Sequence, residues 1–301
     1  MFSGSSVAVI TPMRPDGAID FVAWHGLLEF HWQGGTAAVI VGGTTGESAT
    51  LTENELRELV IAAVEYAREQ GAGDRAAGRM AIIAGAGTSS TASTTERVQW
   101  LGELGIDGVL VVTPAYVKPT QEGLFRHYEA IAGAAKVPVV LYNVPGRTAV
   151  DMLPATVARL AALPRIVAIK ESVAGAARVR EILALAPRFT VLSGDDATAR
   201  EAILAGAQGV ISVTANVAPA AMSAMVAAAR AGDLARSAAI DAKLARLHED
   251  LFVEGNPIPV KWALHTKGMI DSGIRLPLTS LSARFYDRVA AAMAQAGLGP
   301  A

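Results

Sequence analysis

Cysteine is absent from the 301 residues of this chain. Without a thiol the protein can form no disulfide, and it has no thiolate to serve as a nucleophile or metal ligand. The five histidines lack the paired spacing that metal-binding histidines share. They are His25, His31, His127, His248 and His265. We therefore expect no metal site.

The chain also lacks a long uninterrupted hydrophobic run, although 51% of its residues are hydrophobic. The longest apolar stretch, Ala218 to Ala229, contains Pro219 and Ser223 and is far shorter than the ~20 residues of a membrane span. The first residues, Met1 to Ser5, have neither the basic nor the apolar segment of a secretory signal. These absences predict a soluble, cytoplasmic protein without a membrane partner.

An excess of charge of either sign is missing as well. The 26 basic and 28 acidic residues are interspersed and leave a net charge of −2. A nucleic-acid-binding protein carries a basic patch or stripe. We therefore expect no nucleic-acid partner.

What the chain does have is a regular alternation of short apolar runs with amphipathic segments. The runs have strand length, and segments of helical periodicity such as 54–69 and 94–104 separate most of them. This alternation indicates a parallel sheet, and eight units by about residue 230 favour a closed (β/α)8 TIM barrel over an open sheet. The expected strands are Val7–Ile10, Ala37–Val41, Met80–Ala84, Val109–Val112, Val139–Tyr142, Ile166–Lys170, Thr190–Leu192 and Gly209–Val213.

The end of the sequence contains no further strand. Helical patterns cover roughly Leu234–Leu251, Pro259–Lys267 and Ser280–Ala296. We expect an α/β protein in which residues 1–230 form the barrel and residues 231–301 form a C-terminal helical region packed on it.

The most informative strand is the one that runs from Ile166 to Lys170, because it is apolar and ends on a lysine. Desolvation disfavours an ammonium group and can lower the pKa of a lysine by several units. A lysine that is neutral near pH 7 attacks carbonyl groups, as Schiff-base catalysis requires. The alternative is a strand-end lysine whose amine reaches solvent.

Active sites of such barrels lie at the carboxyl ends of the strands. The residues expected there bring hydroxyl groups, one arginine and Lys170 to a single rim, which suits a small ketone that carries a carboxylate, together with proton transfer. They are Gly42–Ser48, Thr113–Tyr116, Tyr142–Arg147, Lys170, Ser193–Asp196 and Ile211–Thr214.

The glycine-rich segment Gly42–Ser48 is neither a P-loop nor a dinucleotide fingerprint. Its glycines would let the backbone N–H groups of Thr44 and Thr45 approach an anion. The alternative is an ordinary turn into a helix, for which Thr52 and Glu55 form a plausible capping box.

Two other groups of polar residues have structural interpretations. Adjacent residues on a strand point to opposite faces, so Asp195 and Asp196 are expected to cap the following helix and not to bind a cation. His127 and Tyr128, in an amphipathic helix, are expected to be packing or surface residues.

Four motifs occur in an order and spacing that resemble the dihydrodipicolinate synthase family, within the N-acetylneuraminate lyase superfamily of class I aldolases. The similarity extends from Gly4 through the segment Phe252–Lys261 to Pro277. Each motif alone is weak, but the ordered set is specific. The motifs are Gly43–Glu47, Tyr142–Thr148, Ile169–Glu171 and Ser193–Asp196.

The resemblance implies a catalytic group of four residues. Lys170 would form the Schiff base with pyruvate, so the covalent imine takes the place of a cofactor. Tyr142 would relay protons within reach of Thr44 and of a second tyrosine, Tyr116. In this family the second tyrosine comes from a neighbouring subunit, so the resemblance implies a homo-oligomer, with a dimer of dimers expected.

The resemblance also implies four substrate-binding residues. Thr45 would hold the pyruvate carboxylate, and Arg147 would bind the carboxylate of aspartate 4-semialdehyde, since a guanidinium fork matches a carboxylate. Gly194 and Ile211 would close the site. The implied reaction condenses the two substrates to 4-hydroxy-tetrahydrodipicolinate, in diaminopimelate and lysine biosynthesis.

Two other functions remain as alternatives. Sialic acid lyases and sugar-acid aldolases share the lysine and tyrosine but not the segment Asn143–Arg147, so a pyruvate-dependent aldolase for another aldehyde or sugar acid is the first. The second is a non-catalytic barrel that binds a keto acid. A pure binder would have no use for a proton relay.

Lysine-inhibited relatives carry polar side chains at a dimer interface where this chain differs. The corresponding residues lack the carboxylate and the amide that would hold lysine, so we expect an enzyme insensitive to it. They are Glu53, Leu56, Ser89, Ser93 and Ala115. The segment Gly71–Arg79 is longer than the usual connection at that point in the family.

Overall fold

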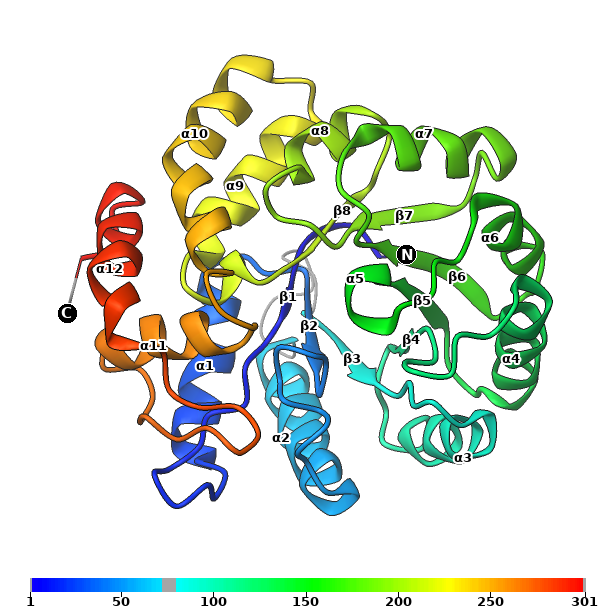
Figure 1. Ribbon diagram of the computed structural model, residues 1–301, viewed down its shortest axis with the longest axis horizontal. Coiled ribbons are helices and arrows are strands. Elements are labelled where there is room, and N and C mark those ends of the chain that lie inside the picture. The colour runs from blue at the N-terminus through cyan, green and yellow to red at the C-terminus, as the bar shows by residue number, and fades with distance from the viewer. Residues whose placement is uncertain (1, 72–79, 300–301) are drawn as a thin grey trace.

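Eight parallel strands form a closed barrel in which each strand pairs with its sequence neighbours and β1 pairs with β8 (Figure 1). The computed structural model describes residues 2–71 and 80–299, so most of the long segment before β3 lies outside the described residues. The predicted (β/α)8 barrel is confirmed. The strands are β1 (Gly4–Ala8), β2 (Ala38–Val41), β3 (Ala81–Gly85), β4 (Gly108–Val112), β5 (Val139–Asn143), β6 (Ile166–Glu171), β7 (Thr190–Ser193) and β8 (Gly209–Ser212).

Helices surround the barrel and follow the strands in the order expected of a right-handed βα repeat. The helices that precede the C-terminal region are α1 (Phe21–Gln33), α2 (Glu53–Gly71), α3 (Thr91–Leu101), α4 (Gln121–Ala134), α5 (Pro145–Thr148), α6 (Pro154–Ala161), α7 (Ala176–Leu185), α8 (Ala199–Leu204), η1 (Thr214–Asn216) and α9 (Pro219–Arg230).

The period of two along each strand divides the core into an inner and an outer layer. In β2, Ala38 and Ile40 point into the barrel, whereas Val39 and Val41 pack under the helices. Three of the inward residues are alanines, and Tyr142 lies at the upper end of the inner layer. The barrel interior is therefore filled, and the site must lie above it. The inner layer comprises Phe2, Ala8, Ala38, Ile40, Ile83, Leu110, Val140, Tyr142, Ala168, Leu192 and Ile211.

The first strand begins earlier than the hydrophobic pattern predicts. Gly4 pairs with Gly209 of β8, and a Cβ on Gly209 would lie 2.0 Å from the backbone oxygen of Gly4. The close approach requires glycine at position 209, and the φ of 90° at Gly4 favours glycine there too. Gly4, Ser5 and Ser6 give no apolar signal in the sequence. The prediction of Val7–Ile10 was therefore wrong at its start, and it was also wrong at its end, because β1 ends at Ala8 although the apolar run continues to Ile10.

The predicted capping box at α2 is confirmed. The side chain of Glu55 accepts from the backbone N–H of Thr52 at 2.8 Å, and Thr52 Oγ1 accepts from the N–H of Glu55 at 3.2 Å. Two N–H groups that the helix leaves without a partner are satisfied in this way. The helix therefore starts at a fixed point after the glycine-rich loop.

The C-terminal helices stand beside α1 and α9 at one side of the barrel (Figure 1). They are α10 (Leu234–Asp250), α11 (Ile258–Thr266), η2 (Ala283–Phe285) and α12 (Tyr286–Gln295). The helix α10 packs on α9, and α12 packs on α10. The division of the chain at residue 230 stays a prediction, and α9 ends at Arg230.

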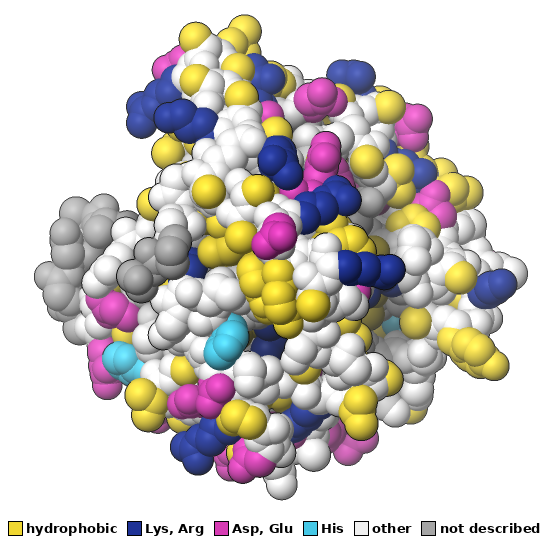
Figure 2. Space-filling view, turned by 60° about the vertical axis from the view of Figure 1, so that its left-hand side comes forward, with side chains coloured by type: hydrophobic (Ala, Val, Ile, Leu, Met, Phe, Trp, Pro, Cys, Tyr) yellow, Lys and Arg dark blue, Asp and Glu magenta, His cyan; other side chains and the backbone are white. Residues whose placement is uncertain are grey.

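Basic and acidic side chains are interspersed on the face shown in Figure 2, where hydrophobic side chains gather near the centre. Among the helices of the described ranges, none is both long enough and apolar enough to cross a membrane.

Candidate active site

Lys170 and Tyr142 lie side by side on neighbouring strands at the carboxyl end of the barrel. The register of β5 and β6 pairs Tyr142 with Lys170 and Asn143 with Glu171. The amine nitrogen Nζ of Lys170 is 4.4 Å from the centre of the Tyr142 ring, and the lysine is only 5% exposed. The side chain is therefore largely buried beside Tyr142 and does not extend out into solvent as the alternative interpretation would require.

Thr44 and Tyr142 face the same cavity, which has a volume of about 330 Å³. The glycine-rich loop after β2 brings Thr44 there by folding back on itself, since the N–H of Glu47 donates to the carbonyl of Thr44 at 3.1 Å. The turn needs small residues below it, because a Cβ on Gly85 would lie 2.1 Å from the carbonyl oxygen of Gly42. The loop is thus a tight turn built on β3.

Thr45 and Arg147, to which the family resemblance gives the carboxylates of the two substrates, share one neighbour. The side-chain amide of Asn256 donates to Thr45 Oγ1 at 2.9 Å, and the carbonyl oxygen of Asn256 accepts from Arg147 Nη2 at 3.4 Å. Thr45 is 2% exposed, whereas Arg147 is exposed at the rim. The sequence contained Asn256 in the segment Phe252–Lys261, but nothing in the pattern indicated that it meets both residues.

Gly194 lies directly against the lysine. A Cβ at this position would be 3.0 Å from Lys170 Cε and 2.1 Å from Ser172 Oγ, so a larger residue would displace the lysine chain. The N–H of Gly194 donates to the carbonyl of Glu171 at 2.7 Å. Ile211 belongs to the inner barrel layer and is 1% exposed.

Two of the four predicted catalytic residues, Thr44 and Tyr142, line the same cavity, whereas Lys170 and Tyr116 do not. Lys170 lies beside the Tyr142 ring, and Tyr116 points away into solvent. Its side chain is 92% exposed, and its backbone has a φ of 74°, which few residues other than glycine adopt. Strain of this kind persists only where the surroundings or a function maintain it. The ring is exposed to solvent in the single chain, so the structure does not bring it together with Lys170 and Tyr142.

A buried ion pair attaches the glycine-rich loop to the C-terminal region. Glu47, with a φ of 56°, receives a short hydrogen bond from Lys261 of α11, and the two side chains are 0% and 5% exposed. The N–H of Arg275 also donates to Glu47, at 3.2 Å. Burial lowers the pKa of Lys261, and the Glu47 carboxylate opposes that shift. The sequence motifs included both partners, yet their contact spans 214 positions and gave no local signal.

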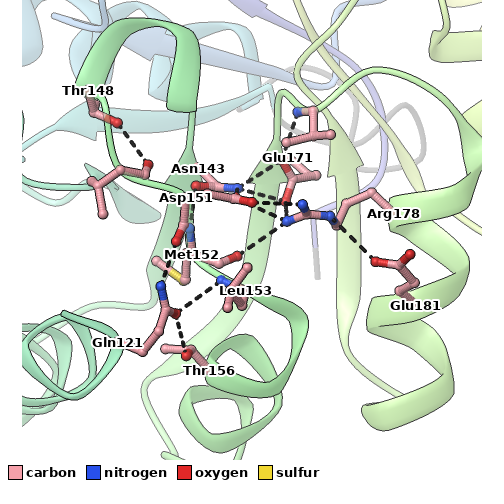
Figure 3. Close-up of polar contacts among 12 residues, drawn as sticks. Gln121, Asn143, Thr148, Asp151, Met152, Leu153, Thr156, Glu171, Arg178 and Glu181 are labelled. Carbon is pink, nitrogen blue, oxygen red and sulfur yellow. Dashed lines mark hydrogen bonds and ion pairs between the residues drawn. The ribbon is translucent and has the colours of Figure 1, made fainter. Parts of the chain in front are cut away.

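A second polar cluster, drawn in Figure 3, lies on the outer side of β5 and β6. Lys170 and Tyr142 precede its residues Glu171 and Asn143 on these two strands and face the inner side. Asn143 bridges Asp151 and Glu171, and Arg178 of α7 binds Asp151 through two hydrogen bonds of 3.0 and 2.8 Å. Desolvation raises the pKa of Glu171 to about 7. The sequence analysis assigned no role to any of these four residues.

Asp195 and Asp196 have different roles, and the prediction that the pair caps a helix was wrong for the second. Asp195 accepts from the N–H of Thr198 at 3.0 Å, just before α8. Asp196 is buried and accepts from the N–H groups of Val213 and Thr214, at 2.8 and 2.9 Å. Both residues follow the end of β7, so the alternation of a strand does not apply to them.

His127 and Tyr128 are packing residues, as expected. Tyr128 is fully buried and donates to the carbonyl of Val111 at 2.9 Å. His127 contacts Thr91 Oγ1 at 2.9 Å, and burial lowers its pKa to about 4. Within residues 2–71 and 80–299, no three His, Cys, Asp or Glu side chains are grouped so that they could hold a metal ion.

In this parallel barrel a buried lysine lies near the carboxyl end of β6, beside a tyrosine of β5. This arrangement is that of a lyase of the class I aldolase type. Residues 1–296 match the model of the dihydrodipicolinate synthetase family. The chain belongs to this family.

Individual relatives cover almost the whole chain. The 4-hydroxy-tetrahydrodipicolinate synthase of Methylococcus capsulatus is 53% identical over 99% of this chain and 100% of its own length. The chloride-inhibited dihydrodipicolinate synthase of Acinetobacter baumannii, solved in complex with pyruvate, is 45% identical with a TM-score of 0.94, over 99% and 100% of the two chains. A monomeric dihydrodipicolinate synthase variant is 40% identical with a TM-score of 0.93, over 99% and 97%.

Proposed function

We propose that this chain condenses pyruvate with L-aspartate 4-semialdehyde through a Schiff base on Lys170. The product is 4-hydroxy-tetrahydrodipicolinate, in the biosynthesis of diaminopimelate and lysine. The observation that carries the proposal is the position of Lys170, a 5% exposed residue whose amine nitrogen lies 4.4 Å from the centre of the Tyr142 ring at the upper end of the barrel. The chain's membership of its family favours this aldehyde over the sugar acids of the superfamily.

The chemistry begins at the lysine. The amine of Lys170, in its unprotonated form, attacks the keto carbon of pyruvate, and water leaves as the imine forms. The imine withdraws electrons, so the methyl group can lose a proton to give an enamine. The enamine carbon adds to the aldehyde of the second substrate, whose own amine then displaces Lys170 and closes the ring. Because the imine serves as the electron sink, the reaction needs no metal or other cofactor.

Proton transfers fall to Tyr142, Thr44 and Tyr116. Thr44 and Tyr142 face one cavity. Tyr116 is exposed on its own chain, so in this proposal it completes the relay of a neighbouring subunit. The active unit is then at least a dimer, and a dimer of dimers is the expected assembly. One relative is described as monomeric, so the assembly of this chain has to be measured directly.

The two carboxylates have separate partners. Thr45 and the loop backbone bind the carboxylate of pyruvate, beside Lys170, while Gly194 and Ile211 close the site. Arg147 binds the carboxylate of the semialdehyde from the rim, where its side chain is exposed. A guanidinium makes two parallel hydrogen bonds to a carboxylate and so fixes the orientation of the aldehyde.

The first test is covalent trapping. Pyruvate and borohydride should add one pyruvate-derived group per chain, and peptide mass mapping should locate it on Lys170. Lys170→Ala is the control and should remain unlabelled. A label on Lys243, Lys261 or Lys267 would refute the assignment. Activity should survive chelators, and a loss restored by Zn²⁺ would show that the imine is not the electron sink.

The second test concerns the aldehyde. In Arg147→Ala, trapping of pyruvate should survive, while turnover of the semialdehyde falls at least ~10²-fold. This size reflects the ~1.5–3 kcal/mol of a charge-assisted bond and the misplaced aldehyde that follows its loss. Arg159→Ala, which removes a surface ion pair with Glu122, is the matched control and should behave as wild type. Normal turnover by Arg147→Ala would point to an aldolase for another aldehyde.

A further inference from the structure

The polar cluster of Asn143, Asp151, Glu171 and Arg178 begins one residue after the catalytic pair on the same two strands, β5 and β6. Tyr142 and Lys170 point into the barrel, and the next residue of each strand, Asn143 and Glu171, points outward. Both outward side chains are buried, with Asn143 0% and Glu171 2% exposed. A polar group buried to this extent requires partners for every donor and acceptor.

The side chain of Asn143 makes its hydrogen bonds to two different segments of the chain. Its amide nitrogen donates to Asp151 Oδ1 at 2.7 Å and to both oxygens of Glu171 at 3.1 Å. Its amide oxygen accepts from the N–H of Met152 at 2.9 Å. Asn143 therefore connects the end of β5 with β6 and with the segment that returns after α5.

Arg178 completes the cluster from α7 (Figure 3). It binds both oxygens of Asp151 and lies 3.9 Å from Glu171 Oε2, with a side chain 14% exposed. Its third acidic neighbour, Glu181, is 3.7 Å away and 59% exposed. The carboxylates of Asp151 and Glu171 thus share the single positive charge of Arg178. Because Arg178 forms hydrogen bonds to the carboxylate of Asp151 but not to that of Glu171, the negative charge of Glu171 is the less well balanced of the two.

The chain between Asn143 and Asp151 forms the loop that carries Arg147. The helix α5 lies within it, and Thr148 Oγ1 donates to the carbonyls of Val144 and Val150 at 3.2 and 3.1 Å. Thr113 of the preceding unit donates to the same hydroxyl at 3.0 Å. These hydrogen bonds fix the internal conformation of the loop. The position of the whole loop therefore depends on where its two ends are held.

We propose that Glu171 and Arg178 are positioning residues for the second substrate, because through Asn143 and Asp151 they hold both ends of the Arg147 loop. The inference rests on the role of Arg147 in the proposed function. It predicts that disturbing the cluster moves the guanidinium at the rim and leaves the pyruvate site, which Thr45 and Lys170 form, largely intact.

The geometry shows why a neutral glutamine cannot replace Glu171. The carboxylate accepts from Asn143 and also from the N–H of Val173, at 2.8 Å, and it faces Arg178. A glutamine would turn one N–H2 group toward these donors, so one end of the Arg147 loop would lose its anchor. Protonation of Glu171 has the same effect. Burial raises its pKa to about 7, while Arg178 lowers it and Asp151 raises it.

The experiment compares Glu171→Gln with Glu181→Gln, which removes the exposed carboxylate near the same arginine. In Glu171→Gln the KM for the semialdehyde should rise at least ~10-fold, because a bound carboxylate tolerates little misplacement. Borohydride trapping of pyruvate and its KM should stay within about twofold of wild type. Glu181→Gln should change neither constant. The wild-type KM for the semialdehyde should also rise as the pH falls through 7, and Glu171→Gln should abolish that rise.

A conservative variant and a reference variant complete the test. Arg178→Lys keeps the charge but cannot bind Asp151 through two bonds, so its KM should lie between those of wild type and Glu171→Gln. The inference would be overturned if Glu171→Gln had the same KM for the semialdehyde as wild type. It would also be overturned if this variant lost pyruvate trapping and semialdehyde turnover to the same extent. If Arg147→Ala raises the KM for the semialdehyde and Glu171→Gln does not, only the inference fails. If Arg147→Ala has no effect, the proposed role of Arg147 and the inference both fail.

Discussion

Lys261 of α11 forms a buried ion pair with Glu47 of the glycine-rich loop, across 214 positions of the sequence. The loop that carries Thr44 and Thr45 is therefore held from above by the C-terminal helical region and from below by β3. The neighbouring pair Arg275 and Glu55 adds a second connection, which lowers the pKa of Glu55 to about 2. The C-terminal helices thus contribute to the site, although they add no strand to the barrel.

Breaking this pair on one side should be costly. Lys261→Met leaves the Glu47 carboxylate buried without its cation, and we expect a loss of about 3–5 kcal/mol in the free energy of unfolding. In the double variant Glu47→Gln/Lys261→Met no buried charge remains, so most of that loss should be recovered. Urea unfolding monitored by circular dichroism measures both values. A double variant as unstable as Lys261→Met would show that the uncompensated charge is not the cause.

Mixing two inactive variants tests whether Tyr116 acts in a partner's site. Tyr116→Phe lacks the relay hydroxyl, and Lys170→Ala lacks the nucleophile. In a mixed dimer, one site receives both intact groups, so activity should reappear when the subunits exchange. Size-exclusion chromatography with light scattering gives the assembly, and each variant alone is the control. Full activity of wild type in a proven monomer would contradict the shared relay.

Buried His31 should make the protein sensitive to acid. The ring is 0% exposed, its Nδ1 contacts Thr36 Oγ1 at 3.2 Å, and burial lowers its pKa to about 3. In the unfolded chain the His31 ring takes up a proton near pH 6.5, whereas in the folded chain it stays neutral until the pH is much lower. The resulting stability is complete above pH 6.5 and is lost as the pH falls toward 3, at up to about 1.4 kcal/mol per pH unit.

The contribution of His31 can be separated from that of Glu171, which has the opposite sign. The raised pKa of Glu171 gives stability that is present below about pH 4.5 and is lost as the pH rises to about 7. We therefore compare wild type with His31→Asn, which keeps a polar atom near Thr36, by urea unfolding between pH 5 and 8. Below pH 6.5 the wild type should lose stability relative to His31→Asn, because only the wild type has the histidine that is protonated in the unfolded chain. A difference independent of pH would contradict the prediction.

Lysine should not inhibit this enzyme at millimolar concentration. Glu53 already pairs with Arg97 at 3.1 Å, Leu56 is buried, and Ser89 Oγ donates to the carbonyl of Ala115 at 2.8 Å. The polar groups that would hold lysine are absent or used elsewhere, and each lost charge-assisted bond costs ~1.5–3 kcal/mol. A coupled assay at increasing lysine concentration measures this. Half-inhibition below a millimolar would show that other residues bind lysine.

The sequence predicted the barrel because its strands are buried on both faces and therefore appear as apolar runs of strand length. It located β6 and Lys170 for that reason. It missed the start of β1, where Gly4 and two serines give no apolar signal although Gly4 must pair closely with Gly209. It also assigned Asp196 to a helix cap, because a carboxylate before a helix is a local pattern and its bonds to Val213 and Thr214 are not.

The sequence by itself determined which residues stand at the carboxyl ends of the strands, since hydrophobic periodicity and turn residues act over short distances. Only the tertiary structure decided which of them meet. Closure of the barrel places Lys170 beside Tyr142, and the C-terminal region brings Asn256 to Thr45 and Lys261 to Glu47. These contacts join residues far apart in the chain, and the burial of charge that makes each partner necessary arises only when the chain is folded.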